Sequence, residues 1–371
     1  MTCAALLCID QNGEILMRER YREGSARSAK NILSVIEKTK ADNEVILVFL
    51  HRSVDGDCVG SASGIAGMAR ALGAEAYVAI QEELPVTMEF MQLDDLFFRT
   101  DVDSPMAEEY RTCGTIGGKK VGAAIATDCS EGSRMGLCGE LFESIEPKIV
   151  VDHHASVTTR EDNYWVDPDS SSACELVFYV AEQMAQLTGK ALNELLQPRI
   201  AKAVLSGIVT DTGRFTFKNT HPETLESAGQ LIGLGGDISE ACYNLFDRKT
   251  KEKFLMSAKA RSLVNFYCDG KFAMSVVPYE LFAELNAGPD SVDDVVSAIR
   301  DIDGVELAIV LRQLENGEIR ANIRSQDYFD CSEFAGSFGG GGHIRAAGFT
   351  VKNGDINEVA GEIIKKVQAA I

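Results

Sequence analysis

The sequence lacks long hydrophobic runs and paired cysteines. No stretch of about eighteen apolar residues occurs in it, which excludes an ordinary membrane-spanning helix. The opening residues, MTCAALLCIDQNGE, reach acidic positions too early for a signal peptide. The 10 cysteines are scattered without a CxxC pair, which disfavours a disulfide framework or a zinc ribbon and indicates reduced thiols. These absences predict a cytoplasmic protein with no membrane partner.

The sequence also has few basic residues relative to acidic ones. Lysine and arginine total 36 against 56 aspartates and glutamates, so the formal net charge is −20. A protein this acidic does not coat a long nucleic acid, because such binding depends on neutralising phosphates. If the chain binds nucleotides, we expect short ones, with a bound metal or a few arginines offsetting the field. Most of the acidity is interpreted as a solvated surface.

The order of apolar runs and amphipathic segments predicts the fold class. A chain of 371 residues with 45% apolar content suggests two or three domains. Strands are predicted at Glu44–Leu50, Glu75–Ile80, Val121–Thr127 and Ile149–Val151, with helices between them at Gly60–Gly73 and Arg134–Ile145. This alternation is typical of parallel βαβ units. The predicted class is therefore α/β, with a parallel sheet in the N-terminal part.

The remaining segments suggest where the domains divide. Further helices are predicted at Ser25–Lys40, Ser171–Gly189 and Pro198–Val209, and another begins in the capping pattern Thr220-His221-Pro222-Glu223. Asn12-Gly13 suggests a hairpin near the N-terminus, where a sheet-edge addition and a dimer contact are both open. Segments Asp237–Phe254 and Leu255–Phe266 are expected to be helical.

Later strands at Lys271–Val277, Val305–Gln313 and Glu318–Arg324, with helices at Ser291–Arg300 and Asp355–Ala370, predict a smaller α/β domain. The expected boundaries are an extension over 1–40, a first domain over 41–240, a helical linker over 241–264 and a second domain over 265–371.

Acidic and imidazole side chains follow three of the predicted strands. They are His51, Asp55 and Asp57 after the first strand, Asp128 after the third, and Asp152-His153-His154 after the fourth. Taken singly, Asp55 and Asp57 would also fit a solvated turn, and Asp128 would fit a helix cap. Paired histidines after a buried strand favour a functional site more strongly, because neutral imidazole is the commonest transition-metal ligand.

A fourth acidic position, Asp211, lies just beyond the helix predicted over Pro198–Val209. An acid there faces the negative end of the helix dipole, which costs about 0.3–1 kcal/mol. Capping of the next turn would explain it, and a bound cation would remove the penalty. Parallel strands deliver their terminal residues to one crevice, and carboxylates packed there repel one another unless cations hold them. One or two divalent ions such as Mn²⁺ would suit these donors, and a two-ion site is the usual device for hydrolysing phosphate esters.

A glycine-rich segment near the C-terminus suggests an anion-binding element. Residues 337–348 read SFGGGGHIRAAG, with four consecutive glycines. Such a loop can present backbone N–H groups to an anion and let a ligand approach closely. His343, Arg345 and Arg324 would add donors, and arginine suits bidentate phosphate recognition. A flexible linker is the alternative, which the strand-like and helical segments on both sides disfavour.

These motifs, taken in order, resemble those of a known family. HRSVDGD, ATD, VVDHH, IVTDTGRF and FGGGGHIRAAGF are similar to the motifs of the DHH phosphoesterase superfamily, in its RecJ-like form with a DHH-associated C-terminal domain. The similarity covers roughly residues 40 to 371, and the group it resembles most is the bacterial nanoRNase/pAp phosphatases. Ser53-Val54 replaces the family's common Asn-Pro, and Cys58 follows Asp57, but neither change removes a ligand. The resemblance implies a metal-binding DHH domain over 41–240 and a substrate-binding domain over 265–371, with the active-site cleft between them.

The resemblance also implies roles for individual residues. Two Mn²⁺ ions are expected, with Mg²⁺ or Co²⁺ as alternatives. His51 and Asp55 would bind one ion, Asp57, His153 and Asp211 the other, and Asp128 would bridge them. Asp152 would orient the site, and His154 would face the scissile phosphate. The nucleotide would be held by Arg324, Ser325, Gly340, Gly341, Gly342 and His343.

The implied reaction is hydrolysis of short nucleotides by a metal-activated water. The expected substrates are oligoribonucleotides of two to five residues, cleaved to mononucleotides, and adenosine 3′,5′-bisphosphate (pAp), converted to AMP. A cyclic di-AMP or pApA phosphodiesterase on the same scaffold is the nearest alternative. A manganese pyrophosphatase is disfavoured by the loop containing His343, and a non-catalytic nucleotide- or RNA-binding module by the complete ligand set. Whether the chain forms a homodimer is left open.

Overall fold

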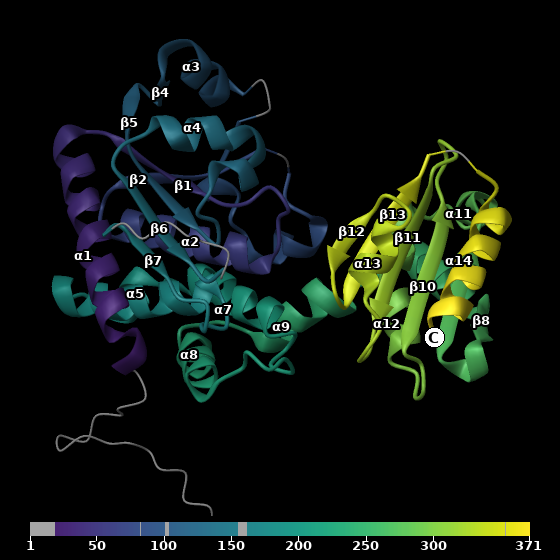
Figure 1. The fold of residues 1–371 in the computed structure, drawn as a ribbon. Helices are drawn as coiled ribbons and strands as arrows, with labels where there is room; N and C mark the ends of the chain where they lie inside the picture. The colour runs from purple at the N-terminus through teal and green to yellow at the C-terminus, as the bar shows by residue number, and fades with distance from the viewer. Residues whose placement is uncertain (1–18, 82, 101–103, 155–161, 353) are drawn as a thin grey trace, which may run out of the picture. The chain divides into compact units, whose positions relative to one another are not determined.

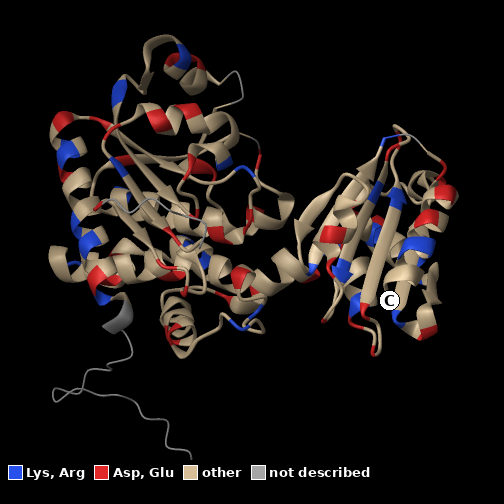
Figure 2. Ribbon diagram, viewed as in Figure 1, with Lys and Arg blue, Asp and Glu red and all other residues tan. Residues whose placement is uncertain are grey.

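The computed structural model describes all residues except 1–18, 82, 101–103, 155–161 and 353. The hairpin predicted around Asn12-Gly13 lies outside the described residues. The chain divides into two compact units, one ending at Arg248 and the other running from Lys249 to Ile371. Among the described residues, no helix combines the length and apolar character that a membrane crossing requires. Acidic and basic side chains are spread over both units (Figure 2).

The first unit is built on a parallel sheet, as predicted. Its strand order is β3-β2-β1-β5-β6-β7, and every pair along this path is parallel. The strands are β1 (Val45–Phe49), β2 (Glu75–Ile80), β3 (Phe97–Arg99), β5 (Lys119–Thr127), β6 (Lys148–Asp152) and β7 (Tyr164–Val166), with β4 (Thr115–Ile116) antiparallel to β5. The central strands are continuous apolar runs because both faces of the sheet are buried.

Helices cover both faces of this sheet (Figure 1). One face packs on α1 (Glu19–Asp42), α2 (Gly56–Ala71), α5 (Ala173–Thr188) and α7 (Pro198–Asp211), and the other on α3 (Pro105–Cys113) and α4 (Gly139–Ser144). Alternate residues of β1 serve the two cores: Ile46 and Val48 join the first, Val45 and Leu47 the second. The first layer is closed by α6 (Leu192–Leu195), α8 (Pro222–Gly233) and α9 (Ile238–Cys242).

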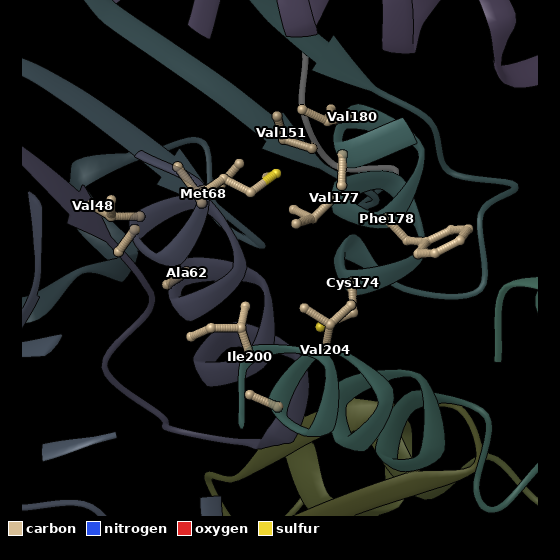
Figure 3. Packing of buried hydrophobic residues seen from close by; sticks show 14 of the residues in the cluster. Val48, Ala62, Met68, Val151, Cys174, Val177, Phe178, Val180, Ile200 and Val204 are labelled. Atoms are coloured by element: carbon tan, nitrogen blue, oxygen red, sulfur yellow. The ribbon is translucent and has the colours of Figure 1, made fainter. Parts of the chain in front are cut away.

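Helix α2 packs against α5 and α7, and Figure 3 shows apolar side chains from these helices, among them Met68, Val177 and Val204. A Cβ on Gly60 would collide with the carbonyl oxygen of Ala203 and lie 2.7 Å from Sγ of Cys174. Glycine is therefore required where α2 passes these two helices. This contact fixes the start of α2, which follows the first group of acidic residues directly.

The second unit contains a mixed sheet in the order β12-β13-β11-β10-β9-β8. Its strands are β8 (Val264–Tyr267), β9 (Phe272–Val277), β10 (Leu307–Gln313), β11 (Ile319–Ser325), β12 (Gly341–His343) and β13 (Ala346–Val351). Only β9 and β10 are parallel among these pairs. One core lies under α13 (Cys331–Gly336) and α14 (Ile356–Ala370), and the other under α10 (Lys251–Ser262), α11 (Tyr279–Glu284) and α12 (Val295–Arg300). The predicted α/β class is confirmed for both units.

Several local predictions are wrong in extent. The helix expected over Arg134–Ile145 is two short 3₁₀ turns, η4 (Gly132–Arg134) and η5 (Gly136–Cys138), followed by α4, because Gly136 adopts a φ of +60°. The helical stretch expected after Asp237 is interrupted by a π turn at Tyr243–Asp247, and its last part is strand β8. The glycine-rich stretch is not an open loop throughout, since Gly341–His343 pair with β13. Helix α8 is capped at His221 rather than Thr220.

Candidate metal centre

The site is assembled at the carboxyl ends of three adjacent strands. His51 lies two residues beyond β1, Asp128 directly follows β5, and Asp152 is the last residue of β6. Because β1, β5 and β6 are parallel neighbours, these residues meet at one edge of the sheet. The backbone N–H of Asp128 donates to the carbonyl of Val151 at 3.0 Å, which ties the two strand ends together.

Asp128 occupies the centre of the cluster. Its Oδ2 lies 3.1 Å from Nε2 of His51, and its Oδ1 lies 3.3 Å from Nε2 of His153. The side chain is buried, and Oδ1 has no hydrogen-bond partner that meets ordinary geometry. The two carboxylate oxygens therefore face different histidines, and Oδ1 receives no hydrogen bond.

His51 and Asp55 form one side of the cluster. Nε2 of His51 lies 3.6 Å from Oδ2 of Asp55. Asp55 is the N-cap of α2, where its Oδ1 accepts the backbone N–H of Cys58 at 3.0 Å. The cap engages one oxygen and leaves Oδ2 toward His51. The potential donor atoms of His51, Asp55, Cys58 and Asp128 lie within 4.8 Å of one another.

Asp57, His153 and Asp211 form the other side. Nε2 of His153 lies 3.6 Å from Oδ2 of Asp57 and 3.3 Å from Oδ2 of Asp211. Asp57 is fully buried, and its two oxygens accept the backbone N–H groups of Ala173 and Cys174 at 2.7 and 2.8 Å. These donors belong to the first turn of α5, where the helix dipole favours a negative charge.

His154 is oriented by Asp152. Oδ1 of Asp152 lies 2.8 Å from Nδ1 of His154 and accepts the backbone N–H groups of His153 and His154. Its Oδ2 accepts the hydroxyl of Ser130 at 2.5 Å. Asp152 is thus occupied by its neighbours and lies behind the two histidine rings, while His154 remains one-third exposed.

The electrostatics of the cluster fit divalent cations. Burial, and then the charge of Asp128, raises the pKa of Asp57 to about 7. Burial, and then the charge of Asp57, raises the pKa of Asp211 to about 9. Burial would also raise the pKa of Asp128, but the neighbouring imidazoles of His153 and His51 outweigh it and lower the value to about 2. These carboxylates cannot all ionise at neutral pH without added positive charge, which bound cations would supply.

Two residues beside the cluster were not predicted. The guanidinium of Arg134 lies 3.3 Å from Nε2 of His154, in a segment expected to be the start of a helix. Asn219 donates from Nδ2 to the carbonyls of Ser171 and Asp211, at 3.0 and 3.1 Å. Asn219 thereby joins the end of α7 to the turn before α5. No periodic signal marks either residue, because their contacts join different elements of the chain and follow no helical or strand spacing.

The residues predicted to hold a nucleotide lie in the second unit. Arg324 and His343 both pair with Ala346 of β13, from its opposite sides. Residues on one rung share a face of the sheet, so these two side chains start about 10 Å apart on the same face. Ser325 is buried and donates to the carbonyl of Phe329 at 2.7 Å.

The glycines of this motif differ in their surroundings. A Cβ on Gly340 would collide with the carbonyl of Gly348, and one on Gly342 would lie 2.5 Å from the carbonyl of Ala346. Gly341, by contrast, has open space beside it. Gly340 and Gly342 are therefore explained by close packing near β13, whereas Gly341 is not.

Comparison with known proteins accounts for both units. The model of the DHH family N-terminal domain matches residues 45–208, and that of the DHHA1 domain matches residues 269–371. The chain is 30% identical over 335 residues to the bifunctional oligoribonuclease and PAP phosphatase NrnA of Thermus thermophilus, covering 90% of this chain and 92% of that protein. It is 25% identical over 312 residues to the protein of the same name in Bacillus subtilis, covering 83% and 90%.

Two further matches are more distant. The cyclic-di-AMP phosphodiesterase PdeA of Listeria monocytogenes is 24% identical over 353 residues, which is 92% of this chain but 50% of that protein. An exopolyphosphatase-related protein from Bacteroides fragilis has a crystal structure similar to this one, with a TM-score of 0.75 at 20% identity, covering 92% of this chain and 97% of that chain. That likeness supports the fold alone. The two domain models and the Thermus relative show that the chain belongs to the DHH family and is a phosphoesterase of the DHH–DHHA1 type, with a candidate His/Asp metal centre.

Proposed function

We propose that the protein is a manganese-dependent phosphoesterase that hydrolyses short nucleotides, either oligoribonucleotides of two to five residues or pAp. The observation that carries the proposal is the position of Asp128, whose two oxygens face His51 on one side and His153 on the other. A carboxylate between two donor groups is the arrangement that a two-metal hydrolase requires.

The positions of these residues support the proposed set of metal ligands. His51 and Asp55 would hold one ion, Asp57, His153 and Asp211 would hold the other, and Asp128 would serve both. Mixed imidazole and carboxylate donors suit Mn²⁺, with Mg²⁺ and Co²⁺ as alternatives. Bound there, the ions would supply an acidified water and positive charge for the phosphoryl oxygens.

The other side chains prepare the site for a phosphate ester. Asp152 holds the ring of His154 through Nδ1, and we assign His154 to face the scissile phosphate. The leaving oxygen takes its proton from water, or from His154 when that ring is protonated at Nε2. In the second unit, Arg324, Ser325, His343 and the glycines at 340–342 are assigned to hold the nucleotide.

The net charge of the chain and the names of its relatives support a short substrate. A net charge of −20 disfavours long RNA or DNA, and two relatives carry names that describe oligoribonuclease and PAP phosphatase activity. A cyclic-dinucleotide phosphodiesterase is the second candidate, because the Listeria relative carries that name. A binding module without catalysis is a weaker one, since all six proposed ligands are present.

A substrate panel tests the proposal. Purified protein with Mn²⁺ is assayed on pAp, pApA, a tetraribonucleotide, cyclic di-AMP, pyrophosphate and a long RNA. We expect turnover of pAp or of the short RNAs and little of the long RNA. Turnover of cyclic di-AMP that is orders of magnitude faster than that of pApA or pAp would replace the first candidate with the second. Nucleotide binding without any turnover would point to the binding module.

A further inference from the structure

Arg134 lies at the edge of the metal centre without a role in the proposed ligand set. It ends the short turn η4, which follows Asp128 by way of residues 129–131. Its backbone carbonyl accepts the N–H of Arg52 at 2.9 Å, and its N–H donates to the carbonyl of Glu131 at 3.0 Å. The turn is therefore docked on the segment that follows β1, and the position of Arg134 is set by backbone hydrogen bonds on two sides.

The contact between Arg134 and His154 has a defined direction. Nη2 of Arg134 lies 3.3 Å from Nε2 of His154. A guanidinium can only donate, so the ring nitrogen accepts, and Nδ1 of the same ring then donates to Asp152 at 2.8 Å. His154 is held at both of its nitrogens, by an acid on one side and a cation on the other.

The charge of Arg134 is not used by the protein itself. Among the described residues, no carboxylate forms an ion pair with it, and it is the one lysine or arginine that hydrogen-bonds to a member of the cluster. A guanidinium has five N–H donors, and the contact with His154 employs one of them. An unpaired, half-buried cation beside His154 is suited to an anion that arrives with the substrate.

We propose that Arg134 is a catalytic residue that binds a non-bridging oxygen of the scissile phosphate and stabilises the charge that develops there. The assignment rests on the proposed phosphoesterase function and adds the cation that recognises the phosphate. Arginine offers two parallel N–H groups to a phosphate, which lysine does not. Hydrogen-bond donors that already point to the place where charge develops stabilise the transition state without having to reorient during the reaction.

The test compares three variants in the full chain. Arg134→Ala should lower kcat/KM for the preferred short nucleotide about 100-fold or more, and Arg134→Lys should recover part of it. Arg52→Ala is the matched control, because it removes the same charge from an exposed neighbour and should change kcat/KM less than twofold. Added guanidinium chloride should restore part of the turnover of Arg134→Ala. Binding of Mn²⁺, measured by equilibrium dialysis, should be the same in all of them.

A second readout separates this proposal from the proposed function. Inorganic phosphate, titrated calorimetrically into the Mn²⁺-loaded protein, should bind at least about tenfold more weakly to Arg134→Ala than to the wild type and Arg52→Ala. If the wild type turns over no short nucleotide but its phosphate binding depends on Arg134, the proposed function fails, while the assignment of Arg134 as the residue that binds the phosphate stands. Turnover and phosphate binding that survive Arg134→Ala would overturn the assignment. So would a loss of Mn²⁺ binding in that variant without guanidinium rescue, because Arg134 would then only support the fold.

Discussion

At the scale of single residues, Asp128 is constrained more than any neighbour in the cluster. Its backbone adopts a φ of +56°, a conformation that non-glycine residues seldom take and that asparagine and aspartate tolerate best. Its side chain is buried and faces His51 and His153. Strain kept at a buried acid is typical of functional sites, and asparagine can replace this residue without disturbing the backbone.

Asp128→Asn should therefore separate activity from folding. We expect turnover to fall by about three orders of magnitude or more, because the bridging charge is lost, while circular dichroism stays unchanged. The rise in Tm that Mn²⁺ produces in the wild type, and that EDTA reverses, should shrink or disappear. Asp42→Asn, at an exposed position of α1, serves as the control. Near-normal hydrolysis by Asp128→Asn would show that the bridging assignment is wrong.

The sequence carries clear signals for some residues of the site and none for others. His51, Asp128 and Asp152 can be placed because each lies at the end of an apolar run, and parallel neighbouring strands end at the same edge of the sheet. Their roles as ligands stay predictions. Arg134 and Asn219 could not be placed, because their partners, His154 and the carbonyls of Ser171 and Asp211, belong to other segments. Tertiary contacts of this kind leave no local pattern.

At the scale of elements, boundaries set by local sequence pattern are predicted correctly, whereas boundaries set by tertiary contacts or by one backbone angle are not. Strand β2 matches its predicted range of Glu75–Ile80, since alternation and length are local properties. Strand β12 was expected as a loop, because pairing with β13 rather than side-chain pattern makes it a strand. The helix expected from Arg134 is broken at Gly136, whose positive φ no helix admits. Propensity is a weak guide where a single backbone angle decides.

The packing of α2 predicts that glycine-to-alanine substitutions in two helices change stability in opposite directions. Gly60→Ala should destabilise the first unit by about 1–3 kcal/mol, because the added Cβ meets the backbone of α7 and Sγ of Cys174. Gly229→Ala in α8 is the matched control: its Cβ meets nothing within 4 Å. That change should stabilise α8 by about 0.5–1 kcal/mol, since alanine favours helices. Urea unfolding measures both, and equal effects of the two substitutions would contradict this account of the packing.

The attachment of α10 to α12 gives a prediction about pH. Burial would raise the pKa of Asp294, but Lys249, Ser257 and Arg261 together lower it. A lowered pKa means that the stabilisation is complete above about pH 4, the value for an unfolded aspartate, and is lost as the pH falls through the folded value.

Asp294→Asn should therefore lower the free energy of unfolding of the second unit by about 1–2 kcal/mol at pH 7. The difference in this free energy between the variant and the wild type should become smaller between about pH 5 and pH 2. Hydrogen exchange of amides in α10 and β9 of the full chain reports the stability of this unit. Asp303→Asn, at an exposed position, is expected to show no such narrowing. If the difference in stability between Asp294→Asn and the wild type does not change with pH, the charge of Asp294 does not stabilise this unit.

At the scale of the whole molecule, the two units divide the expected work. The first contains the His/Asp centre, and the second presents Arg324 and His343 on one face of its sheet. If chemistry belongs to the first unit and nucleotide binding to the second, substitutions in the two should have different kinetic signatures. A residue that binds the ground state and the transition state equally changes KM, whereas one that acts only in the transition state changes kcat.

Arg324→Ala should accordingly raise KM for a short nucleotide about tenfold and change kcat by less than about threefold. Arg320→Ala is the control, because Arg320 lies on the same strand and the same face but pairs with Thr350, two rungs from the glycine motif. It should leave both constants nearly unchanged. Steady-state kinetics over a series from dinucleotide to pentanucleotide would measure the effect for each length. An unchanged KM with a large loss of kcat in Arg324→Ala would place Arg324 in the chemistry and end the proposed division between the units.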